Sequence, residues 1–335
     1  MARVTISDVA AAAGVSTATV SRVINGIGNV NPGMRDRVSA AVNELHYRPN
    51  PTGRVLRQQR TDTVAVLMPD IKNPYFTEFT YFFESSVSAH NIQVSVGNTD
   101  ESLVNEERYV ASAIEQRSAG VVLAVASDRS EAPALIQEKG IPLVLFDRLV
   151  HGYTGASVSV DNRAAGAMAA SHLFARGFQR PAVLTGSRRV SSTRTRADSF
   201  CDAAAKRGMV VDPELVVQTD TRELGAENAV WELIGSGKEF DCLFSTNGPL
   251  TMAAFRVLHE AGWTGYNRVG LIGVDDEFWT SLVTPRVTVI RQPVTEIGRM
   301  AAKLLIEQFG RGTAEGPRSV VLAPQLVVRE STMRV

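Results

Sequence analysis

Three short stretches near the start of the chain have the hydrophobic spacing of amphipathic helices. The first stripe follows the i, i+3, i+4, i+7 pattern of one helix face and consists of Ile6, Val9, Ala10 and Ala13. Gly14 ends this helix, and a second apolar stripe stops at Asn25-Gly26. A third helix is predicted from Pro32 to about Leu45. Two short helices joined by a tight glycine turn predict a helix-turn-helix, completed by the third helix.

Capping residues mark where these helices begin. Thr5 precedes the first helix with Asp8 three residues later, which is the pattern of a capping box. Ser16 can cap the second helix, and Asn31 can cap the third, where Pro32 takes the first helical position. The sequence therefore fixes the start of each predicted helix.

From Thr63 onward, short apolar runs alternate with helical stretches. A first series of β-rich runs lies at residues 64–68, 93–96, 120–124 and 143–146. A second series lies at residues 181–185, 215–217, 242–245 and 269–273. Buried runs separated by helices are typical of parallel strands in βαβ units, and the two series predict two doubly wound lobes.

The composition is that of a soluble protein with more than one domain. The chain has 335 residues, of which 44% are hydrophobic and 21% are charged. No apolar run suits a signal sequence or approaches the roughly 20 residues of a membrane span, so we expect a cytoplasmic protein. Cys201 and Cys242 are too few for a disulfide framework, and no metal or other cofactor is predicted.

Charge is distributed unevenly along the chain. Lysine and arginine together number 35, as do aspartate and glutamate, which gives a net charge of zero. The first 60 residues contain eight arginines against three acidic residues, a balance of +5 that leaves −5 for the remainder. A cationic arm on a mildly acidic body is suited to binding phosphate at one end.

The second predicted helix has a polar face that suits DNA. This face consists of Thr17, Ala18, Thr19, Ser21 and Arg22. Arg22 can pair with guanine through two hydrogen bonds, and Ala18 can touch a thymine methyl group in the major groove. The alternative is a solvated helix on a small bundle, which the charge asymmetry disfavours.

A basic segment rich in proline separates the helices from the first strand. Residues 47–60 contain two prolines and one glycine, so they are interpreted as a linker. Asn50 and Pro51 could start a short helix there, although Gly53 weakens it by about 1 kcal/mol relative to alanine. We therefore expect the segment to become ordered only on DNA.

Polar and aromatic residues follow the predicted strands, where doubly wound folds bind ligands. Those at the strand ends are Asn73, Tyr75, Phe76, Asp147, Arg148, Arg196, Asn247, Asp275 and Asp276. Planar carboxylate, amide and guanidinium groups can each bridge neighbouring hydroxyl groups, while an aromatic ring stacks on a C–H face. Taken singly, each residue could equally be a cap or part of the core. Together they predict a site for a hydroxyl-rich ligand.

The chain resembles the LacI/GalR family of repressors. The resemblance is carried by Thr5 to Asn50, continues through the linker and, more loosely, reaches Val327–Thr332. It implies a homodimer that reads a near-palindromic operator in double-stranded DNA, with hinge helices side by side in the minor groove. Leu56 matches the apolar wedge that opens a central base step. Gly53 and Met34 depart from the alanine and threonine usual in the family.

The resemblance also implies the domain organisation. An all-α helix-turn-helix domain (residues 1–48) and a hinge helix with linker (49–61) precede an α/β, two-lobed domain like type I periplasmic binding proteins (62–335). The latter would bind the effector and dimerise, through an N-lobe (62–161 and 292–320) and a C-lobe (162–291 and 321–335). The predicted DNA-binding residues are Thr5, Ser16, Thr17, Ala18, Thr19, Ser21, Arg22, Asn25, Asn29, Asn31, Tyr47, Arg54 and Leu56.

Effector-contact positions carry over to this chain residue by residue. They are Asn73, Tyr75, Phe76, Asp147, Arg148, Arg196, Asn247, Asp275 and Gln292. The family's usual Asn-Asp pair is Asn247-Gly248 here, which argues against ordinary hexose recognition. The pattern is similar to ribose-type binding proteins and favours a pentose, a nucleoside or a cyclic polyol. We therefore predict a DNA-binding transcriptional regulator, a repressor by resemblance, under allosteric control by such a metabolite.

Three other functions are compatible with parts of the sequence. An enzyme is disfavoured because the sequence lacks nucleophile-elbow, phosphate-loop and dinucleotide-binding motifs, and its histidines lack metal-ligand spacing. A secreted sugar-binding protein would share the lobes but not the basic helices, and it would need a signal peptide. A regulator controlled mainly by a partner protein stays open. The sequence also leaves open whether the effector releases DNA or promotes its binding.

Overall fold

The computed structural model describes residues 4–25, 29–47, 61–220, 223–264, 268–309 and 319–334. The chain forms two compact units, Met1–Arg60 and Thr61–Val335. Among the described residues, no helix is both long and apolar enough to cross a membrane.

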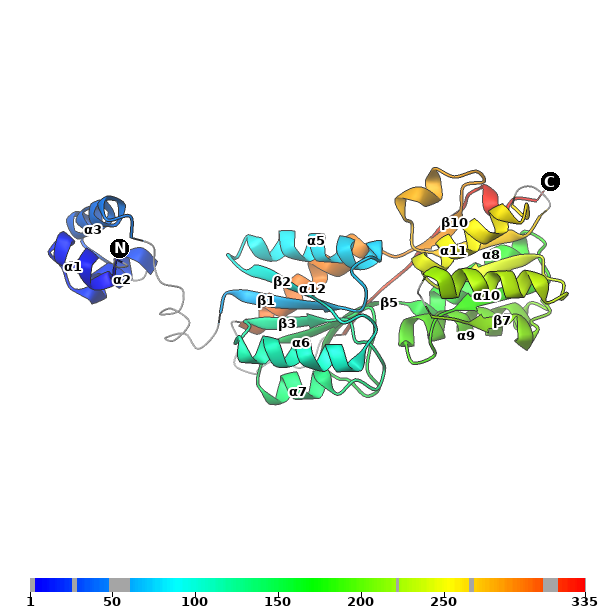
Figure 1. Ribbon diagram of the computed structural model, residues 1–335, viewed down its shortest axis with the longest axis horizontal. Coiled ribbons are helices and arrows are strands. Elements are labelled where there is room, and N and C mark those ends of the chain that lie inside the picture. The colour runs from blue at the N-terminus through cyan, green and yellow to red at the C-terminus, as the bar shows by residue number, and fades with distance from the viewer. Residues whose placement is uncertain are drawn as a thin grey trace. The chain divides into compact units, whose positions relative to one another are not determined.

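In its described residues, the N-terminal unit is a bundle of three helices (Figure 1). These are α1 (Ile6–Ala13), α2 (Thr17–Asn25) and α3 (Pro32–Glu44). Thr5 and Asp8 form the predicted capping box, and Gly14 ends α1 in the left-handed conformation with φ 62°. The bundle core is built on Val9, Ala10, Ala13, Val20, Val38 and Ala41. The predicted helix-turn-helix with its third helix is confirmed.

The first lobe of the larger unit is a six-stranded sheet with helices on both faces. The strand order is β11-β5-β4-β3-β1-β2, and all pairs are parallel. Its strands are β1 (Thr63–Met68), β2 (Gln93–Asn98), β3 (Gly120–Leu123), β4 (Leu143–Phe146), β5 (Ala156–Val160) and β11 (Ser319–Leu322). Its helices are α5 (Pro74–Ser88), α6 (Leu103–Glu115), α7 (Ala132–Glu138) and α12 (Val294–Phe309).

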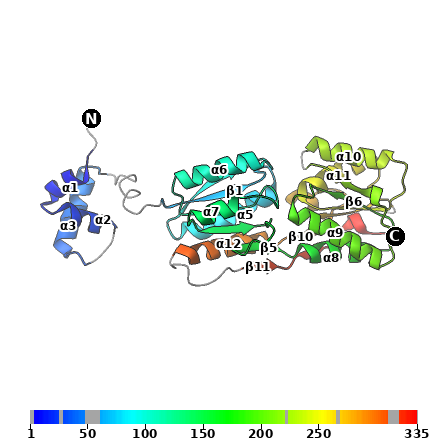
Figure 2. The same cartoon turned by 90° about the horizontal axis from the view of Figure 1, so that it is seen from below.

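Alternate residues of β1 divide between two cores. Val64, Val66 and Met68 pack against α5 and α12, whereas Ala65 and Leu67 pack against α6 and α7. Figures 1 and 2 show these two helix pairs on opposite faces of the sheet. Burial on both faces explains why the strand is a continuous apolar run, as expected for a parallel sheet.

The second lobe repeats this architecture. The strand order is β12-β10-β9-β8-β6-β7, and only the pairing of β12 with β10 is antiparallel. Its strands are β6 (Pro181–Thr185), β7 (Val216–Gln218), β8 (Cys242–Ser245), β9 (Gly270–Val274), β10 (Thr288–Arg291) and β12 (Gln325–Val327). One face packs α8 (Asn162–Ala175) and α9 (Ser191–Lys206), and the other packs α10 (Glu223–Gly235) and α11 (Gly248–Glu260). Three short 3-10 helices are η1 (Pro213–Leu215), η2 (Phe278–Ser281) and η3 (Glu330–Thr332).

The eight predicted strands are all present, and the predicted fold class is confirmed. Four further strands, β5, β10, β11 and β12, were not predicted. In the described residues the chain crosses between the lobes after β5, after β10 and after β11. The Asp161 N–H donates to the Leu322 carbonyl at 2.9 Å and so ties two of these crossings together. Cys242 is buried, whereas Cys201 is only half-buried.

Candidate functional site

Helix α2 presents an exposed polar face in the N-terminal unit. Ser16, Thr17, Ala18 and Arg22 are exposed, whereas Thr19 and Ser21 are half-buried. The Ser16 hydroxyl accepts from the Thr19 N–H at 3.2 Å and so caps the helix. A helix that offers a guanidinium and several hydroxyls on one exposed side can place them against base edges.

Other predicted DNA-binding residues have structural partners within the same unit. Thr5 accepts from the Asp8 N–H, and Asn31 accepts from the Gly33 N–H at 2.9 Å, so both are helix caps. Tyr47 is half-buried and packs against the bundle core, while Asn29 is exposed. Asn25 is the last residue of α2. Arg54, Leu56 and the predicted hinge helix lie outside the described residues.

Asp147 and Asp275 occupy equivalent places in the two lobes. Asp147 follows β4 and Asp275 follows β9, with φ of 59° and 76°. Each backbone N–H donates across to the neighbouring strand, at 3.1 Å to Val158 and 3.0 Å to Ile290. Residues other than glycine rarely adopt positive φ, and such residues cluster at functional sites. Burial raises the pKa of both carboxyl groups, and the positive charge of nearby arginines reduces this increase.

Arg196 is the centre of a buried hydrogen-bond network. Its side chain is 2% exposed, and it donates to Asn162 at 2.7 Å, to the Thr246 carbonyl at 2.9 Å and to Gln292 at 2.9 Å. Gln292 in turn donates to Asp275 at 2.6 Å. The Arg196 guanidinium also lies 3.9 Å from an Asp147 oxygen, which links the second lobe to the first.

Arg148 is held on the first lobe. It makes two hydrogen bonds to Glu101, at 2.7 and 2.8 Å. Its Nε has no hydrogen-bond partner, although it lies 3.4 Å from an Asp147 oxygen. Its guanidinium carbon is 5.8 Å from the centre of the Phe76 ring. A pair of this kind fixes the guanidinium while leaving one donor available.

Asn73 and Asn247 cap helices at the strand ends. The Asn73 side chain accepts from the Tyr75 N–H at 3.0 Å at the start of α5. The Asn247 side chain accepts from the Leu250 N–H at 3.0 Å at the start of α11. Capping uses the side-chain oxygen of each asparagine and so fixes the direction of its NH2 group.

Tyr75 is buried but has no hydrogen-bond partner for its hydroxyl group. Burial raises the pKa of this phenol above its ordinary value, and the charges of Asp147 and Asp275 raise it further. Leaving a buried hydroxyl unsatisfied costs about 1–3 kcal/mol. The tyrosine is therefore poised to hydrogen-bond a bound molecule.

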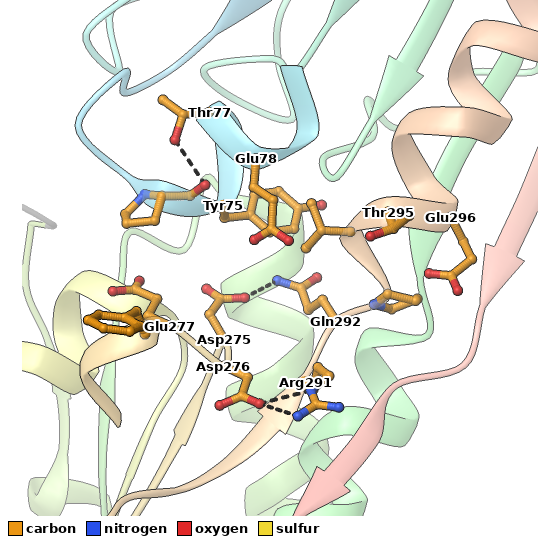
Figure 3. A pocket seen from close by; sticks show the side chains of 14 residues that line it. Tyr75, Thr77, Glu78, Asp275, Asp276, Glu277, Arg291, Gln292, Thr295 and Glu296 are labelled. Atoms are coloured by element: carbon orange, nitrogen blue, oxygen red, sulfur yellow. Dashed lines mark hydrogen bonds and ion pairs between the residues drawn. The ribbon is translucent and has the colours of Figure 1, made fainter. Parts of the chain in front are cut away.

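A cavity of about 710 Å³ opens beside these residues, at the ends of α5 and α12 and the loops after β9 and β10. Figure 3 shows Tyr75, Glu78, Asp275 and Gln292 around a common space, while Asp276 pairs with Arg291 beside it. Three of the predicted effector residues line it, namely Tyr75, Asp275 and Gln292. Arg196 contacts Gln292 and Asp147, and Arg148 lies beside Asp147, so these three residues are connected to the cavity through the network. Asn73, Phe76 and Asn247 do not line the cavity; the two asparagines cap helices, and Phe76 packs beside Arg148. The volume lies within the range of small-molecule sites.

Several residues around this site were not predicted. Glu101 and Asn162 hold the two arginines, and Glu277 and Phe278 line the cavity. Glu277 and Phe278 follow the same strand end as Asp275, so extending the strand-end rule by a few residues would have found them. Glu101 lies in the loop after β2, and Asn162 is the first residue of α8. Both are far in sequence from the arginines that they contact, and nothing local indicates these partners.

The chain is similar to known bacterial regulators along its whole length. Residues 61–327 match the family described as periplasmic binding proteins and sugar binding domain of LacI family, and residues 5–50 match bacterial regulatory proteins, lacI family. The HTH-type transcriptional regulator GalR of Escherichia coli (strain K12) is 31% identical over 90% of this chain and 88% of that protein. The regulator PtxS of Pseudomonas aeruginosa is 33% identical over 98% and 96%.

Solved structures show the same architecture. A structure titled transcriptional regulator CelR-cellobiose complex has 29% identity and a TM-score of 0.74, and it covers 98% of this chain and 100% of that chain. The lac repressor dimer bound to operator and an anti-inducer has a TM-score of 0.86 at 21% identity, covering 99% and 100%, which is a likeness of fold.

Proposed function

This chain belongs to the LacI family of DNA-binding transcriptional regulators, and from that premise we propose that it is a repressor controlled by a small hydroxylated metabolite bound between its two lobes. The metabolite and the operator would each bias one conformational equilibrium. As a regulator of operator DNA, the protein would act in the cytoplasm.

The DNA-binding part of the proposal rests on the N-terminal unit and the linker. The exposed face of α2 offers Thr17, Ala18 and Arg22 for base contacts. We assign residues 1–48 to DNA binding and residues 49–61 to a hinge that orders on DNA, with Leu56 as its wedge. A homodimer would place two copies on a near-palindromic operator.

The effector part rests on one observation, the buried network from Arg196 through Gln292 to Asp275. Two consecutive hydrogen bonds of 2.9 and 2.6 Å fix an amide and a carboxylate at the edge of a cavity that Tyr75 lines from the other lobe. Groups held in this way can bridge neighbouring hydroxyl groups at little cost in side-chain entropy. A pentose, a nucleoside or a cyclic polyol is the effector class that we propose.

A thermal-shift screen of the full chain against pentoses, hexoses, cyclic polyols and nucleosides tests this part. A ligand at 100 times its Kd should stabilise the protein by about 2.7 kcal/mol. Arg196→Ala should abolish the shift because no other side chain can donate to Asn162, Thr246 and Gln292 at once. Arg188→Ala is the matched control, since that arginine is exposed and pairs with Asp198 at the surface.

The outcomes separate the rival functions. If a hydroxylated ligand stabilised the wild type and the Arg196→Ala variant equally, the cavity would not be its site. If no compound in the panel shifted the melting temperature, control by a partner protein would become the better account. Neither result would affect the assignment of the DNA-binding unit.

A further inference from the structure

Carboxylates dominate the wall of the cavity. Its ionisable lining consists of Glu78, Asp275, Asp276, Glu277, Glu296 and Arg291. Arg291 is already paired with Asp276, which also accepts from Arg329 at 2.6 Å. Among the described residues, no ion pair joins Glu78, Glu277 or Glu296 to a cation. The space that a ligand would occupy therefore has an excess of negative charge.

Only one carboxylate oxygen of Glu277 accepts a hydrogen bond. Its Oε2 accepts from the Trp279 indole N–H at 2.9 Å, whereas its buried Oε1 has no hydrogen-bond partner. That Oε1 lies in the space beside Gly248, because a Cβ added to Gly248 would be 1.9 Å from it. The family usually has an aspartate at position 248, where this chain has glycine. The Glu277 carboxylate therefore lies close to where the side chain of that aspartate would begin.

Tyr75 is an independent sign that this space suits a polar ligand. Its side chain is 4% exposed, it lines the same cavity, and its hydroxyl group has no partner. Figure 3 shows Tyr75 and Glu78 on one side of the space and Asp275 and Glu277 on the other. A buried hydroxyl and a buried carboxylate oxygen, both unsatisfied, mark positions that a polar ligand would satisfy.

We propose that the effector carries a protonated amine beside its hydroxyl groups, and that Glu277 is the residue that selects for this amine. The inference rests on the proposed function, because it names the ligand class of the same cavity. An ammonium group donates three hydrogen bonds and accepts none, which matches the unsatisfied oxygens of Glu277 and Tyr75. Amino sugars and aminocyclitols are the compounds that combine an amine with several hydroxyl groups.

The electrostatics of the cavity favour a cation over a neutral or anionic ligand. Burial and, to a smaller extent, the charge of Asp275 together raise the pKa of Glu277 to about 7. Partial burial also raises the pKa of Glu78, as do the charges of Asp275 and Asp276. A bound cation would relieve this repulsion, whereas a phosphate would add to it. Phe278 also lines the cavity and is 82% exposed, and an aromatic ring near a bound cation would add a cation–π attraction.

Calorimetric titration of the full chain with matched compounds tests the proposal. The probes are D-glucosamine, D-galactosamine and D-mannosamine, each compared with its neutral parent sugar and with its N-acetyl derivative. We expect at least one amine to bind more than tenfold more tightly than its parent and its N-acetyl form. Glu277→Gln, which keeps the shape and removes the charge, should reduce that preference to less than threefold.

Two further variants make the test specific. Gly248→Ala should displace the Glu277 carboxylate and lower the preference for the amine in the same way. Glu84→Gln removes an exposed carboxylate from α5 outside the cavity, so it should leave the preference unchanged. A full preference for the amine in Glu277→Gln would remove Glu277 from selection and overturn the proposal.

The proposal and the function on which it rests fail in different ways. If no amine binds more tightly than its parent, including the case in which none binds, the amine proposal is overturned. If neutral sugars then bind the wild type but not Arg196→Ala, the proposed function stands without it. If an amine binds Arg196→Ala as well as the wild type, the cavity is not the effector site and both are overturned.

Discussion

Individual buried polar residues in the larger unit have partners that explain their identity. Arg196 donates to a side-chain amide on α8, a backbone carbonyl after β8 and a side-chain amide after β10. Only a guanidinium has the donors and the fixed planar geometry for three acceptors in different directions. Lysine at this position would leave at least one buried acceptor unsatisfied.

His172 makes folding stability depend on pH. Burial and, to a smaller extent, the charge of the nearby Arg176 lower its pKa from 6.5 to about 4. Its Nε2 lies 2.8 Å from the Thr332 hydroxyl. The folded state therefore keeps the ring neutral, while the unfolded state takes up a proton below pH 6.5. Stability from this residue is complete above pH 6.5 and falls as the pH drops toward 4.

Thermal unfolding between pH 7.5 and 5 checks this expectation. We expect the melting temperature of the wild type to fall over this range more steeply than that of His172→Gln. His90→Gln, which changes an exposed histidine on the first lobe, should follow the wild type. Parallel pH profiles for wild type and His172→Gln would contradict the assignment.

Single residues of the site were predictable to the extent that they follow strands. Asp147, Asp275 and Tyr75 lie at strand or helix boundaries that the apolar runs define, so their proximity follows from the topology of a doubly wound sheet. The partnership of Arg148 with Glu101 depends on how two loops fold, which hydrophobic periodicity does not report.

At the scale of elements, α8 and α9 approach closely at Gly166. A Cβ there would lie 2.2 Å from the Arg196 carbonyl oxygen and 2.8 Å from the Phe200 nitrogen, which are backbone atoms that cannot rotate away. Gly166→Ala should therefore separate the helices and destabilise the protein by about 1–3 kcal/mol. It should also weaken effector binding, because α9 carries Arg196.

A second glycine provides the control for this change. Gly235 is the last residue of α10, and a Cβ there would have nothing within 4 Å. Gly235→Ala should leave effector binding unchanged and stabilise the protein by at most about 1 kcal/mol. Equal melting temperatures for the two alanine variants would show that the helices tolerate the added methyl group.

The role proposed for the linker, residues 49–61, is inferred from the sequence and its resemblance to the family. Leu56→Ala should weaken operator binding by a few kcal/mol, because a wedge of this kind holds a base step open. Effector affinity should stay the same. Gln58→Ala in the same segment is the control, and an unchanged operator affinity in Leu56→Ala would remove the wedge from the mechanism.

Strands were predictable where a buried run is also rich in apolar residues. The eight predicted strands include β1, β3, β4, β6, β8 and β9, which are mainly apolar and are buried at every residue except Thr63. β5 is buried at four of its five residues but contains two serines, and it was missed. The missed strand β11 is an edge strand with an exposed and half-buried pattern, and β12 has only three residues. Short edge strands are defined by their neighbours more than by their own sequence, so periodicity does not reveal them.

In the whole molecule, a ligand in the cavity can control operator binding only if the cavity and the DNA-binding unit share one conformational equilibrium. Three crossings connect the lobes, and contacts such as Leu149 N–H to the Ser191 hydroxyl at 3.1 Å join them on one side. A ligand that prefers one arrangement of the lobes would change operator affinity, and by reciprocity the operator would change ligand affinity by the same factor.

The most direct test is operator affinity measured with and without saturating ligand, by fluorescence anisotropy on DNA selected from a random pool. We expect operator affinity to change by about 5- to 150-fold in the wild type, and not to change in Arg196→Ala, which should still bind the operator. A ligand that binds the wild-type cavity yet leaves operator affinity unaltered would show that the cavity does not control DNA binding.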